Sequence, residues 1–259
     1  MTYPQLSTGA LSQYPTRKRR RNRTVMNTLP DGRKIKLPDV GGQTTEWQLQ
    51  YIGLSDAELE TMQEFFASAE GSLIGFTFLD PCGNLLAWSG DLTQSEWQTD
   101  PFVALTGAVM DPLGGQNAWH VVNSGAGTQQ VAQTLNAPGL YVYCFSVYLR
   151  AAEPTSIALR IGTASAELTA ESDWKRVSIC GTGEASALSV SFGIEVPAGS
   201  AVDVFGPQVE PQTTASAYQV STTGGVYENA RFADDALSHI ATDVNRHSMT
   251  VNIVYANHL

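Results

Sequence analysis

The sequence predicts a mainly β protein in which a split α+β domain, residues 1–82 and 228–259, is interrupted by an antiparallel β-sandwich at residues 83–227. Residues 47–81 show a strand-helix-strand pattern. The sequence that follows has the pattern of short strands and is rich in Gly, Ser, Thr and Ala. A strand pattern returns near the C-terminus. Because a segment of about 30 residues cannot form a core alone, we expect it to pair with the first 81 residues.

The strand-helix-strand pattern follows from local spacing. Trp47, Leu49 and Tyr51 alternate with glutamines, which predicts a strand with one buried face. Ser55 and Glu58 have the spacing of a capping box, so a helix should begin at Ser55 and run to about Glu70. Gly71 can adopt the left-handed conformation that ends a helix, and a second strand should follow through Phe76 and Phe78. The residues expected on the buried helix face are Leu59, Met62, Phe65, Phe66 and Ala69.

The central part has almost no helical periodicity, and turn residues separate its short apolar runs. The strand from Tyr141 to Arg150 is apolar on both faces, so it should be central in its sheet. The other expected strands are Trp119–Val122, Gln129–Leu135, Ser156–Ile161, Trp174–Cys180, Ala187–Ile194 and Ala201–Val209. Past Tyr227, alternation through Met249, Val251, Ile253 and Tyr255 predicts the last strand.

The net charge of -10 conceals a strong asymmetry. Residues 1–36 hold nine Lys or Arg and one acid, so the rest of the chain is strongly acidic. The densest part, which we call the basic arm, comprises Arg17, Lys18, Arg19, Arg20, Arg21 and Arg23. Like charges repel, so this arm should be disordered unless a partner, such as the acidic part of another copy, supplies countercharge. Nucleic acid is the less favoured partner, because no aromatics interleave with the arginines and the remaining chain would repel phosphate.

The cysteines, Cys82, Cys144 and Cys180, are odd in number and lack CxxC spacing, so we expect buried free thiols. No apolar run is long enough to span a bilayer, and the first 25 residues lack the apolar centre of a secretion signal. We therefore expect a soluble chain with no membrane partner.

Enzyme signatures are missing from the sequence. The histidines, His120, His239, His247 and His258, show no metal-ligand pattern, although His239 and His247 could lie close in space. No serine lies in a Gly-x-Ser-x-Gly elbow, and no acid pair resembles a glycosidase dyad. We predict that the chain is not an enzyme and has no catalytic, cofactor-binding or metal-binding residues.

Sugar binding requires an exposed aromatic ring beside polar groups. Trp97 and Trp174 occupy positions typical of core or strand-start residues. Trp88 and Trp119 are less constrained, so they are the candidate glycan platform, with a core role as the alternative.

Two sets of motifs carry a resemblance to known families. The first set is Tyr3-Pro-Gln-Leu, Trp47-x-Leu-x-Tyr51, Leu54-Ser-Asp-Ala-Glu, Phe65-Phe66, Gly71 and Phe76-x-Phe-x-Asp-Pro81. It resembles the belt domain of distal tail and minor tail proteins of long-tailed bacteriophages. The second set is Asn84-Leu-Leu-x-x-Ser89-x-Asp91, Ser95-x-Trp97, the run from Tyr143 to Ala151, Trp174-Lys-Arg176, Phe205-Gly-Pro-Gln-Val-Glu210 and Ala215-Ser-Ala-Tyr218. It is similar to the carbohydrate-binding-module-like jelly rolls found in phage tail proteins.

The resemblance implies a structural virion component made in the host cytoplasm. Such a protein would form a hexameric ring at the tail tip or baseplate and join the tail tube protein to hub and receptor-binding proteins. The inserted jelly roll would be a spacer or would bind a host cell-surface glycan. By analogy it could hold calcium, but no Asp-x-Asp-x-Asp spacing supports this. The rival hypothesis is a free-standing glycan-binding protein for host adsorption. A third hypothesis, a hydrolase, has no support, because the sequence shows no set of catalytic residues.

Overall fold

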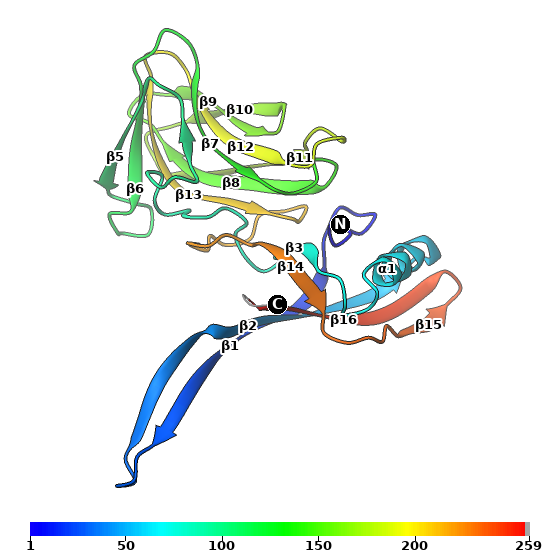
Figure 1. The fold of residues 1–259 in the computed structure, drawn as a ribbon. Coiled ribbons are helices and arrows are strands. Elements are labelled where there is room, and N and C mark those ends of the chain that lie inside the picture. The colour runs from blue at the N-terminus through cyan, green and yellow to red at the C-terminus, as the bar shows by residue number, and fades with distance from the viewer. Residues whose placement is uncertain (257–259) are drawn as a thin grey trace. The chain divides into compact units, whose positions relative to one another are not determined.

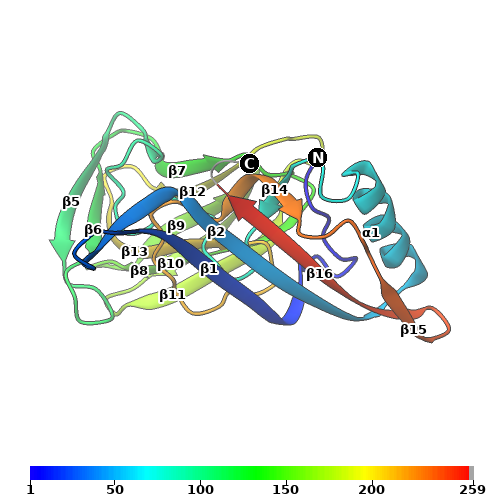
Figure 2. The same ribbon diagram turned by 60° about the horizontal axis from the view of Figure 1, so that its bottom comes forward.

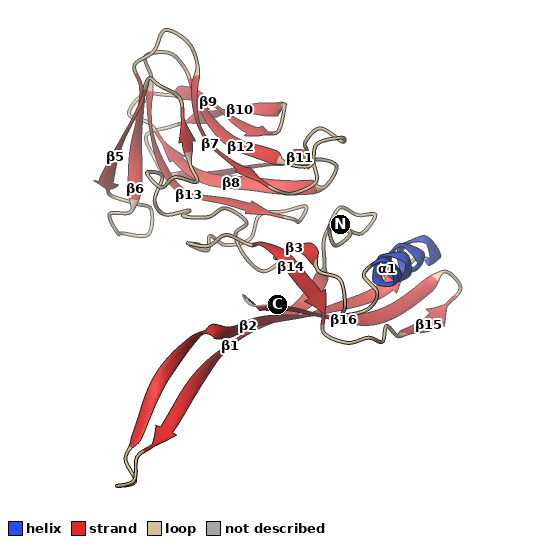
Figure 3. Cartoon of the chain, viewed as in Figure 1, coloured by secondary structure: helices blue, strands red, loops and turns tan. Residues whose placement is uncertain are grey.

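The fold is mainly β, as predicted, and a computed structural model describes it for residues 1–256 (Figure 1 and Figure 3). These residues contain one helix, α1 (Asp56–Ser68), and no helix among them has the length and apolarity needed to cross a bilayer. The chain divides into two compact units. The first comprises Met1–Leu6, Ser12–Phe78 and Tyr227–Leu259, and the second comprises Ser7–Leu11 and Leu79–Val226.

The first unit is built on a six-stranded sheet. Its strand order is β1 (Gln13–Thr28), β2 (Lys34–Leu54), β16 (Arg246–Ala256), β14 (Val226–Phe232) and β3 (Phe76–Leu79), with β15 (His239–Asp243) paired to β16. The predicted last strand is β16, and it lies beside β2, with Trp47 opposite Ile253 and Leu49 opposite Val251. All four side chains are buried, so residues about 200 positions apart in the chain form one core face.

The capping box at the start of α1 is confirmed. The Ser55 hydroxyl accepts a hydrogen bond from the Glu58 amide at 3.3 Å, and the Ser55 amide donates to the Glu58 carboxylate at 3.0 Å. Phe65 packs edge-on against Tyr3 and Phe76, with ring centroids 5.6 and 5.1 Å apart. Helix α1 ends at Ser68, and two left-handed residues follow it, Glu70 at a φ of +50° and Gly71 at +64°, so the left-handed conformation predicted for Gly71 is confirmed.

The prediction of a disordered basic arm is wrong. Residues of the arm belong to β1, which pairs with β2 in a long hairpin. Alternation along the strand places consecutive cations on opposite faces, and the paired strand supplies partners. Arg21 forms a 2.8 Å ion pair with Glu46, and the Lys18 ammonium lies 5.7 Å from the centroid of the Trp47 ring.

The second unit is an antiparallel jelly-roll sandwich of two five-stranded sheets. The first sheet has the order β10 (Ala164–Ala170), β9 (Thr155–Ile161), β12 (Val190–Val196), β7 (Gln129–Leu135) and β4 (Gln98–Thr99). The second has the order β11 (Lys175–Thr182), β8 (Val142–Arg150), β13 (Ala201–Glu210), β6 (Ala118–Asn123) and β5 (Val103–Val109). The central position predicted for the strand of Tyr141–Arg150 is confirmed, because β8 lies between β11 and β13.

The core of the sandwich joins its two sheets through aromatic rings. Phe192 of β12 lies 5.3 Å from the Tyr143 ring and 6.0 Å from the Phe145 ring of β8, measured between centroids. The short segment Ser7–Leu11 also belongs to this unit, since the Leu11 amide donates to the Pro211 carbonyl at 3.1 Å.

The expectation of three free thiols is wrong for two of them. Cys144 and Cys180 form a disulfide between β8 and β11, where they are directly opposite each other. Their separation of 36 residues hides this proximity, which only the strand register produces. Cys82 is half-buried and forms no disulfide in the part of the chain that the structure describes.

Candidate functional site

The most unusual surface of the first unit is the β1–β2 hairpin. Strand β16 pairs with β2 from Leu54 to Thr44, and beyond this point β2 has β1 as its described partner. The two-stranded part from Arg23 to Asp39, which we call the ribbon, is exposed on both faces. An isolated two-stranded ribbon is marginally stable in water, so its extension away from a core requires another reason.

Large apolar side chains are exposed along the ribbon. Val25 pairs with Leu37, and their exposed fractions are 41% and 47%. Met26 is 58% exposed and pairs with Lys36, and Ile35 is 43% exposed. Exposed apolar residues gathered on one small element mark an interaction surface more often than scattered ones do.

Five cations of the hairpin lack a partner. Within the described chain no ion pair or hydrogen bond is made by the side chains of Arg17, Arg19, Arg20, Lys34 and Lys36. The remaining arginines of the hairpin are paired within it, Arg21 with Glu46, Arg23 with Asp39 and Arg33 with Asp31. The predicted basic arm is therefore ordered, but its charge is only partly neutralised.

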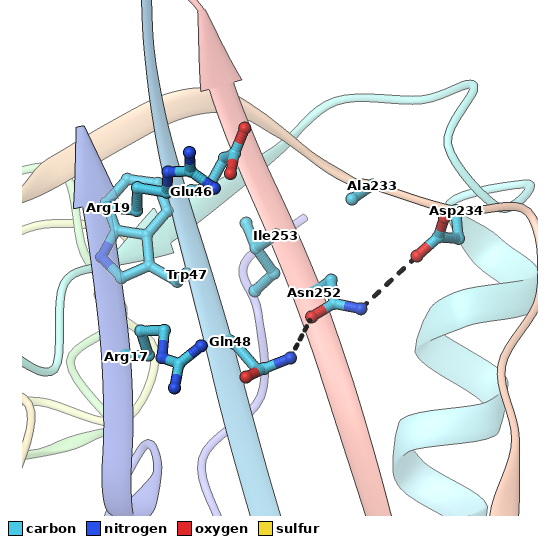
Figure 4. Close-up of a pocket in the computed structure, with 9 residues that line it drawn as sticks. All are labelled: Arg17, Arg19, Glu46, Trp47, Gln48, Ala233, Asp234, Asn252 and Ile253. Carbon is cyan, nitrogen blue, oxygen red and sulfur yellow. Dashed lines mark hydrogen bonds between the residues drawn. The ribbon is translucent and has the colours of Figure 1, made fainter. Parts of the chain in front are cut away.

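Part of the arm borders a hollow of about 330 Å³ on the sheet of the first unit (Figure 4). Arg17 and Arg19 approach it from β1, and Asn252 lies on β16. The Asn252 side chain accepts from Gln48 at 3.3 Å and donates to Asp234 at 3.5 Å. The hollow is lined by the guanidinium groups of Arg17 and Arg19, the amides of Gln48 and Asn252 and the carboxylates of Glu46 and Asp234, so it offers both donors and acceptors to a polar partner.

The structure ties Trp119, one predicted platform residue of the second unit, to the segment that carries the other, Trp88. The Trp119 indole N–H donates to the Gly90 carbonyl at 3.1 Å, and its ring lies against Gly107. The Trp88 carbonyl, two residues before Gly90, accepts from the Trp97 indole at 3.1 Å. Trp88 and Trp119 are half-buried, whereas Trp97 is buried. These contacts hold the segment in place and leave only part of each platform ring accessible.

A second aromatic and polar cluster lies on the outer side of the sheet that contains β8 and β13. Asp203 accepts from Arg150 at 2.7 and 3.0 Å and lies 2.7 Å from Nδ1 of His120. The Arg150 guanidinium carbon lies 4.7 Å from the centroid of the Trp174 ring. We call these four residues the Trp174 cluster.

Sequence reasoning missed the Trp174 cluster because its members come from four separate segments. The alternation of Asp203 with Val202 and Val204 indicates that this acid faces away from the core. However, only the register of β13 with β6 and β8 places it opposite His120 and Arg150. The indole N–H of Trp174 is buried without a hydrogen-bond partner in the described structure. The N–H itself is not accessible, whereas the His120, Arg150 and Asp203 side chains are 44%, 29% and 15% exposed, so these groups can offer polar contacts to a ligand.

The histidines do not form a metal site in the described residues. His239 and His247 lie close, as the sequence allowed, with ring centroids 5.4 Å apart. However, Nε2 of His247 lies 2.7 Å from the Asp56 carboxylate, and no group of three metal-ligating side chains is found between residues 1 and 256. His258 lies outside the described residues.

Comparison with known proteins gives fold likenesses only. No family model matches the chain, and no curated protein matches it. Among solved structures it is similar to the CBM22-1 xylan-binding domain of Paenibacillus barcinonensis Xyn10C, with 14% identity over 51% of this chain and 96% of that one, at a TM-score of 0.43. A second similar structure is TmCBM61 in complex with beta-1,4-galactotriose, with 17% identity over 49% of this chain and 97% of that one, at a TM-score of 0.36. A third is the enzymatically active domain of tailspike protein 4 from bacteriophage CBA120, with 12% identity over 51% of this chain but 22% of that one, at a TM-score of 0.39.

Proposed function

We propose that this chain is a non-enzymatic structural subunit that assembles through its β1–β2 hairpin. The phage distal-tail resemblance of its sequence suggests the setting, a ring at the tail tip of a virion. The observation that carries the proposal is the ribbon itself, an exposed element with apolar side chains and unpaired cations. Such an element gains stability only when a partner covers it.

The test is to shorten the ribbon without disturbing the core. Removal of residues 1–23 is unsuitable, because Tyr3 is fully buried. Replacing residues 24–38 by Asn-Gly keeps Arg23 opposite Asp39 across a two-residue turn that suits a hairpin. The intact full chain should give rotationally symmetric particles by electron microscopy, and the shortened chain should remain monomeric with an unchanged circular dichroism spectrum.

Two results would contradict this function. Symmetric particles of the shortened chain would show that the ribbon is dispensable for assembly. A chain that stays monomeric both alone and with tail tube and hub proteins would remove the assembly role altogether.

The second candidate function is glycan binding by the jelly roll, and the Trp174 cluster favours it. A pyranose stacks its apolar face on an aromatic ring while its hydroxyls bind nearby polar groups. Trp174, Arg150 and Asp203 provide these two kinds of contact within one patch.

A glycan array probed with the full chain tests this candidate. Trp174→Ala should reduce binding at least about tenfold, because the ring on which the sugar would stack is lost. Phe102→Ala is the matched control, since Phe102 is an aromatic residue of the same unit and is 57% exposed. Loss of binding in Trp88→Ala or Trp119→Ala alone would instead favour the platform predicted from sequence, and an array without any bound glycan would count against both.

A further inference from the structure

We infer that the ribbon of one copy docks on the acidic outer side of α1 in the next copy, so that the subunits join head to tail. This inference rests on the proposed assembly function and names the surface that receives the hairpin. Lys34 and Lys36 are the donor residues, and Glu60 and Glu64 are the acceptor residues.

The donor residues lie on one face of the ribbon. Lys34 and Lys36 are separated by one residue on β2, so their side chains point the same way, about 6.7 Å apart along the strand. Neither has a partner in the described structure, and Met26 lies opposite Lys36. The face therefore presents two unpaired ammonium groups beside an exposed apolar side chain.

The acceptor residues lie on one stripe of α1. Glu60 and Glu64 are exposed, and four residues of helix separate them by about 6 Å, which matches the spacing of the two lysines. Within the described chain neither carboxylate forms an ion pair. The helix contains no Lys or Arg, so nothing on α1 itself offsets the repulsion between carboxylates at this spacing.

Apolar side chains extend the acceptor surface past the end of the helix. Leu73 is 64% exposed and Ile74 is 37% exposed. Their loop is held in shape, because the Ser72 amide donates to Asp235 at 2.9 Å and the Arg231 guanidinium donates to the Leu73 carbonyl. The surface is therefore preformed, and it combines acidic and apolar groups as the ribbon combines basic and apolar groups.

The ribbon cannot reach the helix of its own chain. Helix α1 begins just after Leu54, at one end of β2, and the ribbon begins beyond Thr44, near the other end. Twenty residues of strand separate Leu54 from Lys34, a length of roughly 66 Å, whereas a 13-residue helix spans only about 20 Å. The hairpin and α1 lie at opposite ends of this sheet in both views (Figure 1 and Figure 2).

Two different surfaces at opposite ends of one unit make a heterologous contact. Repetition of such a contact closes into a ring when the rotation between copies is suitable. The second copy is thus the occupant that the charge pattern favours, because residues 1–36 are strongly basic while the rest of the chain is strongly acidic.

A charge-swap experiment on the full chain tests this contact. Lys34→Glu with Lys36→Glu reverses the donor, and Glu60→Lys with Glu64→Lys reverses the acceptor. Sedimentation velocity should show self-association weakened at least about tenfold in either variant, because like charges then meet in the contact. The chain that carries all four substitutions should associate again at nearly the wild-type strength.

The control variant carries Glu153→Lys and Asp173→Lys, two exposed acids of the second unit. It makes the same change in net charge as the acceptor variant and should associate like the wild type. The inference is overturned if the acceptor variant associates normally, if the control is weakened equally, or if the fourfold variant stays dissociated. If the ribbon-shortened chain fails to assemble but the acceptor variant self-associates normally, the assembly function stands, and only the inferred docking of the ribbon on α1 is contradicted.

Discussion

The ribbon of the first unit and the sandwich of the second are both antiparallel β structure, yet they differ in how far their apolar side chains are buried and their charged side chains paired. In the sandwich, Phe192 is fully buried and the Asp203 carboxylate is paired with Arg150. In the ribbon, Val25 and Leu37 are exposed and Lys34 has no partner. The difference teaches that strand pairing alone does not stabilise a hairpin, and that the second layer supplies most of the free energy.

The largest expected effect is in the core of the sandwich. Phe192→Ala removes a ring that joins the two sheets, and the cavity and lost burial should lower the free energy of unfolding by about 3–5 kcal/mol. Urea denaturation followed by circular dichroism measures this change. Phe102→Ala removes an exposed ring of the same unit and should cost little, so equal losses in the two variants would mean that Phe192 is not a core residue.

A buried carboxylate gives the next effect, and this one depends on pH. Burial of Asp111 opposes its ionisation, but hydrogen bonds from Gly115, Asn117 and Leu113 outweigh burial and lower the pKa of its carboxyl. The stabilisation is present above the unfolded pKa of about 3.9 and is lost as pH falls through the lower folded pKa. Asp111→Asn should therefore cost about 2 kcal/mol at pH 7, because its amide N–H faces other donors.

The pH series separates this explanation from a simple loss of packing. The difference between wild type and Asp111→Asn in denaturant midpoint should shrink steadily as the pH is lowered below 4. Asp173→Asn, an exposed position of the same unit, should show almost no difference at any pH. A constant difference across the range would contradict the role of the charged carboxylate.

A smaller effect is expected at the start of α1, where the first unit has a core of its own. Ser55→Ala removes the hydroxyl that accepts from the Glu58 amide and should cost about 1 kcal/mol. Thermal unfolding measures it, with Ser68→Ala as the control, because Ser68 bonds only to the carbonyl one turn before it. Equal losses in the two variants would argue against the cap.

These sites also show which features a sequence reveals. The cap of α1 was predictable because Ser55 and Glu58 are three residues apart and act locally. Strand β10 was missed, because its Ala, Ser and Glu residues lack the apolar alternation of a half-buried strand. The disulfide and the Trp174 cluster depend on register between distant strands, which no local pattern encodes. The order of the basic arm depends in the same way on β2, whose Glu46 and Trp47 receive two of its cations.

The smallest effect on stability is expected in the ribbon, where the comparison with the sandwich is sharpest. Leu37→Thr keeps strand propensity and removes an apolar side chain that is already 47% exposed, so the free energy of unfolding should change by less than about 0.5 kcal/mol. Self-association should nevertheless weaken measurably by sedimentation velocity, because the apolar face would be covered only in the assembled state. Leu135→Thr, at a buried position of β7, is the matched substitution and should show the reverse pattern, a large loss of stability. If Leu37→Thr destabilised the monomer as Leu135→Thr does, the ribbon would be part of a folded core and its exposed face would need no partner.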